Sequence, residues 1–385
     1  MLVPSHGAPL SLRGLLTALL ILLALTACST TQRVTQQRLM APEHVEVAQL
    51  RDLAIIEFTG NAGTELTRDV TGRLEDLRVE GAPFFSLAGP MRLHSSRDAD
   101  FGSVEHAEAL DFGRRMETRG VLLGRARMRS SVDLEPAKVW EECADYSKKQ
   151  KRCKKRESKV RHCGRASVDF AYRVQALEVE TGRVVYDPPL QELSDDRSEC
   201  RTAKLKDSER NSEEVHDMMH AAEDRLRRKL MDQAAQRIHH DISPYYVSVQ
   251  LEFLKKSDAL QGLQAERFAV GAGLVGEGQI ESACGIWRNL ELQGASDLAL
   301  SYNLAACAEH REDYARARTL YDDTQRHADL LLRSPAARDG SAAPAQPVQR
   351  NYSFKDWAEL IAKARSRVAG LEYTEETMRM ILETP

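Results

Sequence analysis

The stretch Leu53-Ala-Ile-Ile-Glu-Phe58 is almost wholly apolar and continues into Thr59-Gly60-Asn61. A short apolar run that is closed by turn-forming residues predicts a buried β-strand. Apolar residues then recur at helical spacing from Leu66 to Leu77, with Thr64 as the predicted cap of this helix. Residues 83–87 predict a short strand. A second helical pattern follows, with Met116 as a predicted core residue, and Val121-Leu-Leu-Gly124 predicts another strand. This alternation of strands and helices predicts an α/β domain.

A hairpin and a long helix are predicted next along the chain. Apolar residues alternate with polar ones from Val168 to Ala176, and Glu180-Thr-Gly-Arg183 can turn the chain into Val184-Val-Tyr186. This pattern predicts two antiparallel strands. The charged stretch from Ser208 to His240 has apolar residues at helical spacing and predicts a long helix, and Tyr245 to Leu254 predicts one more extended segment.

The C-terminal half contains an internal repeat. Gly278-x-Ile-x-x-Ala-x-x-x-Trp287 matches Glu312-x-Tyr-x-x-Ala-x-x-x-Tyr321 at an offset of 34 residues, which is the period of tetratricopeptide (TPR) helix pairs. We therefore expect an α-helical TPR-like domain. Its predicted core residues are Val270, Gly271, Ile280, Ala283, Trp287, Leu304, Ala305, Tyr314, Ala317 and Tyr321. The glycine-rich stretch from Gly271 to Gly278 then lies on a helix and a turn, so it predicts no nucleotide-binding loop.

The N-terminus predicts an export signal. Arg13 precedes an apolar run of about 14 residues, which is too short to span a membrane. The run ends in Leu25-Thr-Ala-Cys28, which resembles the lipobox of bacterial lipoproteins and implies that Cys28 carries lipid. The alternative is an ordinary secretory signal with an accidental cysteine. Ser29 resembles the default sorting residue for the outer membrane, facing the periplasm, and the polar residues Thr30 to Pro42 predict a tether.

Overall composition excludes several classes of protein. The chain has 385 residues, is 42% hydrophobic and carries a formal net charge of -4. These values exclude a polytopic membrane protein and a wholly disordered chain. They also argue against a nucleic-acid binder, because the chain has no long-range attraction to phosphate.

One segment departs strongly from this charge balance. Ten cations lie between Lys148 and Arg165, against the single acid Glu157. Clustered cations favour phosphate-bearing or acidic partners, so anionic lipid, lipopolysaccharide, wall polymer and an acidic protein face are candidate ligands. The alternative is a solvated hairpin without a ligand. The ten residues are Lys148, Lys149, Lys151, Arg152, Lys154, Lys155, Arg156, Lys159, Arg161 and Arg165.

Six cysteines remain after Cys28, an even number that suggests disulfides in an oxidising compartment. The four disulfide candidates are Cys143, Cys153, Cys163 and Cys200. Their spacing does not match a structural zinc site, and their pairing stays open. Cys284 and Cys307 lie on helical patterns, where small buried residues are expected. No metal site is predicted, because His216 and His220 lack the neighbouring Glu of a metalloprotease motif.

The order of these predicted elements, in a lipoprotein, resembles the α/β domain of the CsgG family. That family includes curli-secretion lipoproteins and relatives of the TolB N-terminal and penicillin-binding-protein activator domains. The resemblance rests on Leu53–Phe58, Phe84-Phe85, Arg119–Gly124 and Glu180–Tyr186. It implies an α-β sandwich that serves a secretion pore, envelope assembly or the activation of wall enzymes. The charged segment Lys148–Cys163 excludes the alternating apolar hairpins of a curli-type membrane pore.

These features predict how the chain is divided and what it does. The expected segments are a signal peptide (1–27), a lipidated tether (28–46), an α/β domain (47–255) with a basic insertion (131–166), TPR-like helices (256–333), a flexible linker (334–350), and a capping helix with a tail (351–385). We expect a non-catalytic envelope lipoprotein, with lipid as its sole attached group, that acts as a scaffold or assembly adaptor for a protein partner. The alternatives are a ring-forming homo-oligomeric subunit of a secretion system or wall-enzyme activator, and an unrecognised hydrolase.

Overall fold

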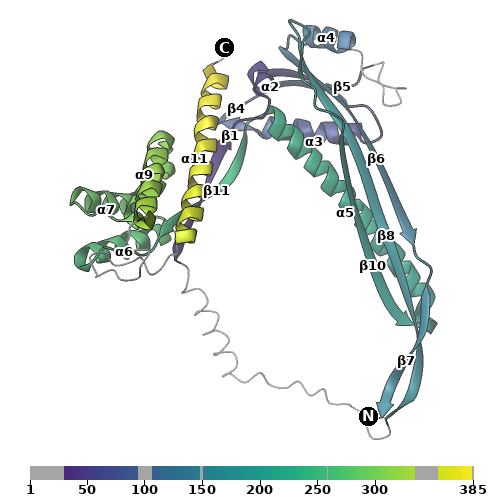
Figure 1. Cartoon of the computed structure of the whole chain (residues 1–385). Coiled ribbons are helices and arrows are strands. Elements are labelled where there is room, and N and C mark those ends of the chain that lie inside the picture. Colours follow the sequence, from purple (N-terminus) through teal and green to yellow (C-terminus); the bar gives the residue numbers. More distant parts are fainter. Residues whose placement is uncertain (1–29, 94–105, 148–150, 258, 334–353, 384–385) are drawn as a thin grey trace. The chain divides into compact units, whose positions relative to one another are not determined.

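The computed structural model describes residues 30–93, 106–147, 151–257, 259–333 and 354–383. The protein is a mixed α/β chain in which a sheet region is followed by a helical region (Figure 1). It divides into two compact units. The α/β unit comprises Ala41–Tyr245 with the residues from Thr377 onward, and the helical unit comprises the described residues up to Met40 with Tyr246–Glu376. In the part of the chain that is described, no helix has both the length and the apolar character needed to cross a membrane.

The centre of the α/β unit is a mixed sheet with the strand order β10-β8-β6-β2-β5. The strands are β2 (Asp52–Ile56), β5 (Ser86–Met91), β6 (Gly120–Leu134), β8 (Arg152–Glu178) and β10 (Gln191–Lys204). Strand β2 runs parallel to β5 and β6, whereas β8 runs antiparallel to β6 and β10. Two shorter strands, β7 (Lys138–Ser147) and β9 (Val184–Tyr186), pair with β8. The predicted strand at Leu53 and the predicted hairpin are therefore both present.

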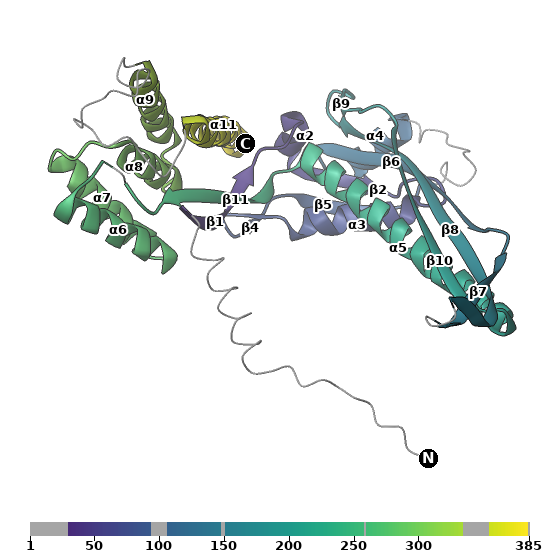
Figure 2. The same ribbon diagram turned by 60° about the horizontal axis from the view of Figure 1, so that its bottom comes forward.

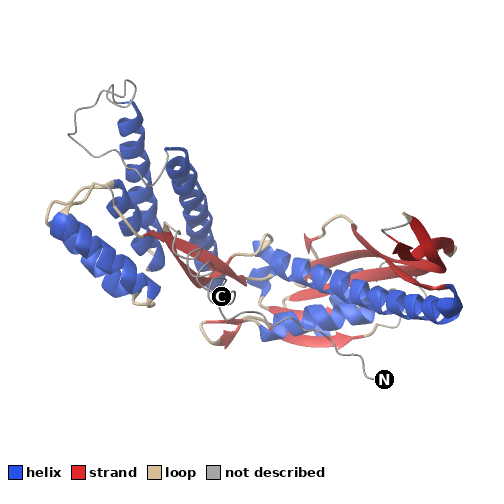
Figure 3. Ribbon diagram, turned by 90° about the horizontal axis from the view of Figure 1, so that it is seen from below, coloured by secondary structure: helices blue, strands red, loops and turns tan. Residues whose placement is uncertain are grey.

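The two faces of this sheet differ because successive residues of a strand point to opposite sides. On one face, the even-numbered residues of β8 from Val168 to Ala176 are buried, and the sheet contacts the long helix α5 (Ser208–Ile242). Helix α3 (Gly63–Asp76) lies beside α5 on the same side of the sheet (Figures 2 and 3). On the other face, helix α4 (His106–Arg115) packs its Phe112 into a core cluster with Val121 and Leu123 of β6.

Shorter elements connect these larger ones. Helix α2 (Val45–Leu50) precedes β2, strands β3 (Arg78–Val79) and β4 (Ala82–Pro83) form a small hairpin, and the 3₁₀ turn η2 (Leu205–Asp207) precedes α5.

Three local predictions for the α/β unit are wrong. Thr64 does not cap α3, because its hydroxyl donates to Glu57 and the helix already begins at Gly63. Met116 is exposed rather than in the core, because α4 ends at Arg115. The predicted short strand over residues 83–87 is divided between β4 and β5, since the buried rings of Phe84 and Phe85 occupy the connection.

The segment 131–166, which was expected to be an insertion, is continuous with the sheet. Strand β6 extends to Leu134, and β8 runs unbroken for 27 residues from the basic hairpin into the core. Strand β7 pairs with the first part of β8, and β6 pairs with its later part from Gly164. The basic segment is therefore a hairpin whose second strand continues into the core as β8.

The helical unit contains a two-stranded sheet. Strand β1 (Thr31–Met40) pairs with β11 (Tyr245–Leu254). The predicted tether is thus a strand over most of its described length, and the segment expected to close the α/β domain pairs with it. Val34, Met40 and Val249 pack against the core of the helices. Polar residues persist in β1 because much of this small sheet stays partly exposed.

The helices of this unit follow the predicted repeat. They are α6 (Gly262–Gly276), α7 (Ile280–Leu292), α8 (Leu298–His310), α9 (Tyr314–Arg333) and α11 (Phe354–Glu383). Asp297 caps α8, because its carboxylate accepts hydrogen bonds from the backbone N–H groups of Ala299 and Leu300. The glycine-rich stretch from Gly271 to Gly278 forms the end of α6 and the turn that follows, as predicted. The expected linker 334–350 lies outside the described residues.

Candidate functional site

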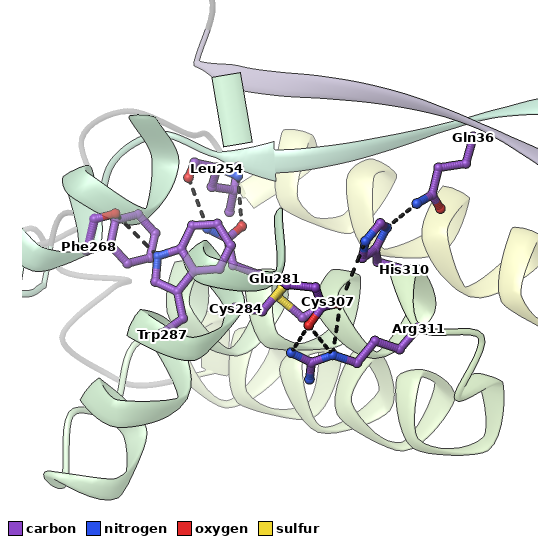
Figure 4. The surroundings of a disulfide bond; sticks show 10 residues. Gln36, Leu254, Phe268, Glu281, Cys284, Trp287, Cys307, His310 and Arg311 are labelled. Carbon is purple, nitrogen blue, oxygen red and sulfur yellow. Dashed lines mark hydrogen bonds and ion pairs between the residues drawn. A yellow bond between two sulfur atoms is a disulfide. The ribbon is translucent and has the colours of Figure 1, made fainter. Parts of the chain in front are cut away.

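Nine of the ten residues predicted for the core of the repeat are buried in the helical unit. They are Gly271, Ile280, Ala283, Trp287, Leu304, Ala305, Tyr314, Ala317 and Tyr321. Gly271 lies against Trp287 so closely that an added methyl group would be 2.7 Å from the indole Nε1. The indole N–H in turn donates to the carbonyl oxygen of Phe268 at 3.3 Å (Figure 4). A residue without a side chain is therefore needed where α6 contacts α7.

Val270 is the exception, and its predicted place in the core is wrong. Its side chain is 56% exposed, because one residue along a helix turns the side chain by about 100° away from the buried face of Gly271. Leu263 lies seven residues earlier on the same side of α6 and is 62% exposed. These two residues form an exposed apolar face on α6.

The end of α7 carries a third exposed apolar residue. Arg267 of α6 donates to the side-chain oxygen of Gln293 at 3.2 Å, which holds the end of α7 beside α6. Leu292, which directly precedes Gln293, is 74% exposed. We call Leu263, Val270 and Leu292 the α6 face. The sequence alone could have indicated this exposure, since Leu263 and Val270 are seven residues apart and lie on the side of the helix opposite the buried positions of the repeat.

A disulfide joins α7 to α8 beside this core. Cys284 and Cys307 are bonded, with their Cα atoms 5.7 Å apart (Figure 4). Both had been expected to be small buried residues, and both are buried. The sequence held a signal for this bond. The repeat places α7, the second helix of one pair, next to α8, the first helix of the following pair, and each of these helices carries one cysteine. The bond fixes the two helix pairs to each other.

Buried charges hold α8 to α11. Glu309 of α8 is fully buried, and Arg367 of α11 donates to its carboxylate with an Nη2–Oε2 distance of 2.8 Å. The hydroxyl of Tyr321 donates to the same carboxylate at 3.0 Å. A buried carboxylate must be paired and hydrogen-bonded in this way to be tolerated. The capping helix expected from the sequence is therefore joined to the repeat by a specific ion pair.

The two strands of this unit also bind to α8 through polar side chains. Asn303 pairs with the backbone of Leu254 in β11, accepting at 2.8 Å and donating at 3.0 Å. Arg38 of β1 donates to the carbonyl oxygens of Glu309 and His310 at 3.1 and 3.0 Å. A cation at this position interacts favourably with the carbonyl groups at the C-terminus of α8.

Two disulfides cross-link the basic hairpin of the α/β unit. Cys143 of β7 bonds to Cys153 of β8, and Cys163 of β8 bonds to Cys200 of β10. The four predicted candidates are thus all in disulfides, and the structure selects one of the three connectivities that the sequence left open. All ten residues of β7 are at least partly exposed, so the first cross-link stabilises a ribbon that has little core of its own.

The predicted basic patch does not form one surface. Because β8 is a strand, Arg152, Lys154 and Arg156 lie on one face, while Lys155, Lys159, Arg161 and Arg165 lie on the other. Acidic neighbours also pair with part of this charge: Arg156 lies 3.2 Å from Glu141, and Arg165 lies 3.1 Å from Asp196. Lys151 lies in the turn before β8, and Lys148 and Lys149 lie outside the described residues.

The end of α5 holds titratable groups whose pKa values are shifted by burial. Burial, helped by the nearby charges of His240 and Arg73, lowers the pKa of His239 to about 4. Burial raises the pKa of Asp241, although its carboxylate accepts a hydrogen bond from the Tyr186 hydroxyl at 2.7 Å. The Tyr186–Asp241 hydrogen bond joins the end of α5 to β9, and burial disfavours the charged form of His239.

The remaining predictions concern the lipidated cysteine and metal binding. Cys28 and the lipobox lie outside the described residues. His216 and His220 are neighbours on α5, with their Nε2 atoms 3.1 Å apart. Within the described ranges, no group of three or more His, Cys, Asp or Glu side chains is arranged to hold a metal ion.

Comparison with known proteins gives no family. No protein-family model matches the sequence. No curated protein matches it either. Among solved structures, it is similar to the PelC dodecamer from Paraburkholderia phytofirmans, with 15% identity, a TM-score of 0.19 and coverage of 45% of this chain and 83% of that one.

Two further solved structures show a similarity of the same order. A homolog of the neuraminyllactose-binding hemagglutinin from Helicobacter pylori has 14% identity and a TM-score of 0.18, covering 52% of this chain and 81% of that one. The hypothetical protein CT253 from Chlamydia trachomatis has 10% identity and a TM-score of 0.22, covering 49% and 97%. These scores are too low to support an argument about fold or function.

Proposed function

We propose that this protein is a non-catalytic, membrane-tethered scaffold of the bacterial cell envelope whose helical unit binds another protein. The α6 face is the observation that carries the proposal. Leu263, Val270 and Leu292 are large apolar side chains that stay mostly exposed on two adjacent helices. Leu263 and Val270 share one side of α6, and burying such exposed apolar residues against a protein partner would remove them from water.

The rigidity of the helical unit supports this function. The Cys284–Cys307 disulfide fixes α7 to α8, and the Glu309–Arg367 ion pair fixes α8 to α11. A preformed surface binds more tightly than a flexible one, because less conformational entropy is lost on binding. The TPR-like spacing of the sequence agrees with such a binding module.

An envelope location follows from two further features in this proposal. Three disulfides are typical of proteins in an oxidising compartment. The lipobox-like sequence that ends at Cys28 would attach the chain to the outer membrane facing the periplasm, with the CsgG-like α/β unit as part of the scaffold. Confinement to a membrane surface raises the effective concentration of the protein for a partner in the same membrane.

Affinity capture from mildly solubilised membranes tests the function. The full chain should retain a defined heteromeric partner, and the double variant Leu263→Asp/Val270→Asp should lose it. Leu330→Asp is the matched control, because Leu330 is an exposed apolar residue on a different helix, α9. Loss of the partner in the control but not in the double variant would contradict the proposed surface.

The same experiment distinguishes the alternatives. A homomeric ring without a second protein would support the ring-forming secretion or wall-enzyme-activator function. Hydrolytic activity without a stable partner would contradict both interpretations. The lipid anchor has its own test, since Cys28→Ser should move the protein from the membrane fraction to the soluble fraction. Unchanged membrane retention of that variant would exclude the anchor.

A further inference from the structure

The open face of the sheet in the α/β unit carries a groove of about 690 Å³. Apart from Leu190, its lining residues come from three neighbouring strands, β6, β8 and β10, and its polar ones lie on the side of the sheet opposite α5. Figure 1 shows these three strands side by side. Its lining residues are Arg127, Arg129, Asp169, Phe170, Ala171, Leu190, Glu192, Leu193 and Ser194. A volume of this size suits a small molecule.

Strand register places the polar side chains of the groove in two adjacent rows. Arg127 lies opposite Ala171, which lies opposite Glu192. Arg129 lies opposite Asp169, which in turn lies opposite Ser194. Residues that are directly opposite in a sheet share a face, so both rows point to the same side.

Among the described helices, α4 is the one that packs on this face of the sheet, and it covers only part of it. Helix α4 packs on the same face, but its contacts on β6 are with Val121 and Leu123. The following outward residues of β6 are Arg125, Arg127 and Arg129, at alternate positions. Arg127 and Arg129 are both exposed. The groove therefore begins where the cover of α4 ends.

Within the described part of the chain, the polar side chains of the groove are without partners. Across the described residues, Arg127, Arg129, Asp169, Glu192 and Ser194 make no side-chain hydrogen bond or ion pair, although Arg129 and Asp169 are directly opposite each other.

Charged residues just outside the groove behave differently. The guanidinium of Arg173 binds both carboxylate oxygens of Asp187, at 2.8 and 2.7 Å, and Arg165 lies 3.1 Å from Asp196. Charges on this face are thus paired around the groove and unpaired inside it.

The groove has a positive side and a negative side. Arg127 and Arg129 lie on β6, while Asp169 and Glu192 lie on β8 and β10, and neighbouring strands are about 4.8 Å apart. A ligand with only negative charge would meet the carboxylates, and a ligand with only positive charge would meet the arginines. A ligand with both charges, separated by about 5–10 Å, would find a partner for each.

We propose that this groove binds a small zwitterion. Its carboxylate or phosphate group is held by Arg127 and Arg129, whose planar guanidinium groups suit both anions. Its ammonium group is held by Asp169 and Glu192, and its apolar middle lies over Ala171 and beside Leu190. A peptide terminus pair and a phosphoethanolamine group both carry this chemistry.

Titration calorimetry on the purified full chain tests the proposal with two probes, triglycine and O-phosphoethanolamine. At least one should bind with a dissociation constant below about 1 mM, and which one binds separates a carboxylate from a phosphate source. If triglycine binds, N-acetyltriglycine and triglycinamide should each bind at least about tenfold more weakly, because each lacks one of the two charges. For phosphoethanolamine, the matched comparison is its N-acetyl derivative.

Variants identify the site. Arg129→Gln and Asp169→Asn should each weaken binding of the active probe by about tenfold or more. Arg114→Gln is the control, because Arg114 is an exposed cation on α4 outside the groove, and it should bind like the wild type. Exposed residues on a paired strand can be changed without unfolding the sheet, which circular dichroism would verify. Absence of binding by both probes, or equal binding by the N-acetylated probe, would overturn the proposal.

Discussion

Arg367 of α11 and Glu309 of α8 form an ion pair in which the carboxylate is fully buried and the guanidinium is largely buried. The second guanidinium nitrogen lies 2.8 Å from Glu309 Oε2. We expect Arg367→Ala to lower the free energy of unfolding of the helical unit by about 3–5 kcal/mol, because it leaves a buried carboxylate without its counter-charge. Urea unfolding followed by tryptophan fluorescence would measure this loss.

The matched control for that variant lies two residues away on the same helix. Arg365 pairs with Asp322 at 2.7 Å, but both side chains are well exposed. Arg365→Ala should therefore cost no more than about 1 kcal/mol. Equal losses in the two variants would contradict the importance of burial.

Two glycines on α6 should respond in opposite ways to substitution by alanine. Gly271→Ala should destabilise the helical unit by about 1–3 kcal/mol, because the new methyl group meets the ring of Trp287 in a packed core. Gly273→Ala should stabilise it by about 0.5–1 kcal/mol, because there is open space at Gly273 and alanine favours a helix. Thermal unfolding of both variants would measure the difference. A stabilising Gly271→Ala would show that α6 and α7 are not packed as described.

Removal of the disulfide between α7 and α8 should loosen the helical unit. The bonded cysteines are 23 residues apart, and closing a loop of this length contributes about 3 kcal/mol. We expect Cys284→Ala/Cys307→Ala to lower the denaturation midpoint of this unit. Cys143→Ala/Cys153→Ala should leave that midpoint unchanged, since this bond closes the hairpin of the other unit. An equal shift in both double variants would argue against a local effect.

His239 makes the stability of the α/β unit depend on pH. Its pKa is about 4 in the folded chain, mainly because of burial, against 6.5 when exposed. The contribution of His239 to the free energy of unfolding is fully present above pH 6.5 and decreases as the pH falls from 6.5 to 4. Below pH 4 it no longer changes, and the total loss is about 3 kcal/mol. The raised pKa of Asp241 acts in the opposite direction, so the comparison must be made between variants that keep Asp241.

His239→Gln isolates the effect of the histidine. The variant should show a smaller decrease in unfolding free energy between pH 6.5 and 4 than the wild type, because the unfolded chain no longer gains a proton at this position. Urea unfolding at several pH values measures both slopes. Identical slopes would mean that the pKa of His239 is the same in the folded and the unfolded chain.

The sequence predicted those strands and helices whose buried residues recur at a regular spacing along the chain. The alternation from Val168 to Ala176 is buried on one face as expected, because every second residue of a strand points to the core. The repeat predicted nine buried positions for the same reason, at helical spacing. It failed at Val270, since the apolar side chain there was assigned to the core together with Gly271 although the two lie on different sides of α6.

Contacts between distant residues could not be predicted. Strand β1 appeared to be a polar tether because its partner β11 lies more than 200 residues away, and because Arg38 is buried through contacts with α8 that no local pattern shows. The basic cluster between Lys148 and Arg165 appeared to be one patch because the residues are close in sequence. Extending the strand of Val168 back to Arg152 would have divided the cations between two faces.

The Cys163–Cys200 bond has a consequence for assembly. Cys163 and Cys200 are directly opposite each other in the pairing of β8 with β10. A slip of β10 by one residue against β8 would turn the side chains of β10 to the opposite face and would also separate the two sulfur atoms, because a disulfide forms only between closely facing cysteines. The disulfide can therefore form only in chains in which β8 and β10 are correctly aligned. Once formed, it holds the two strands in that register.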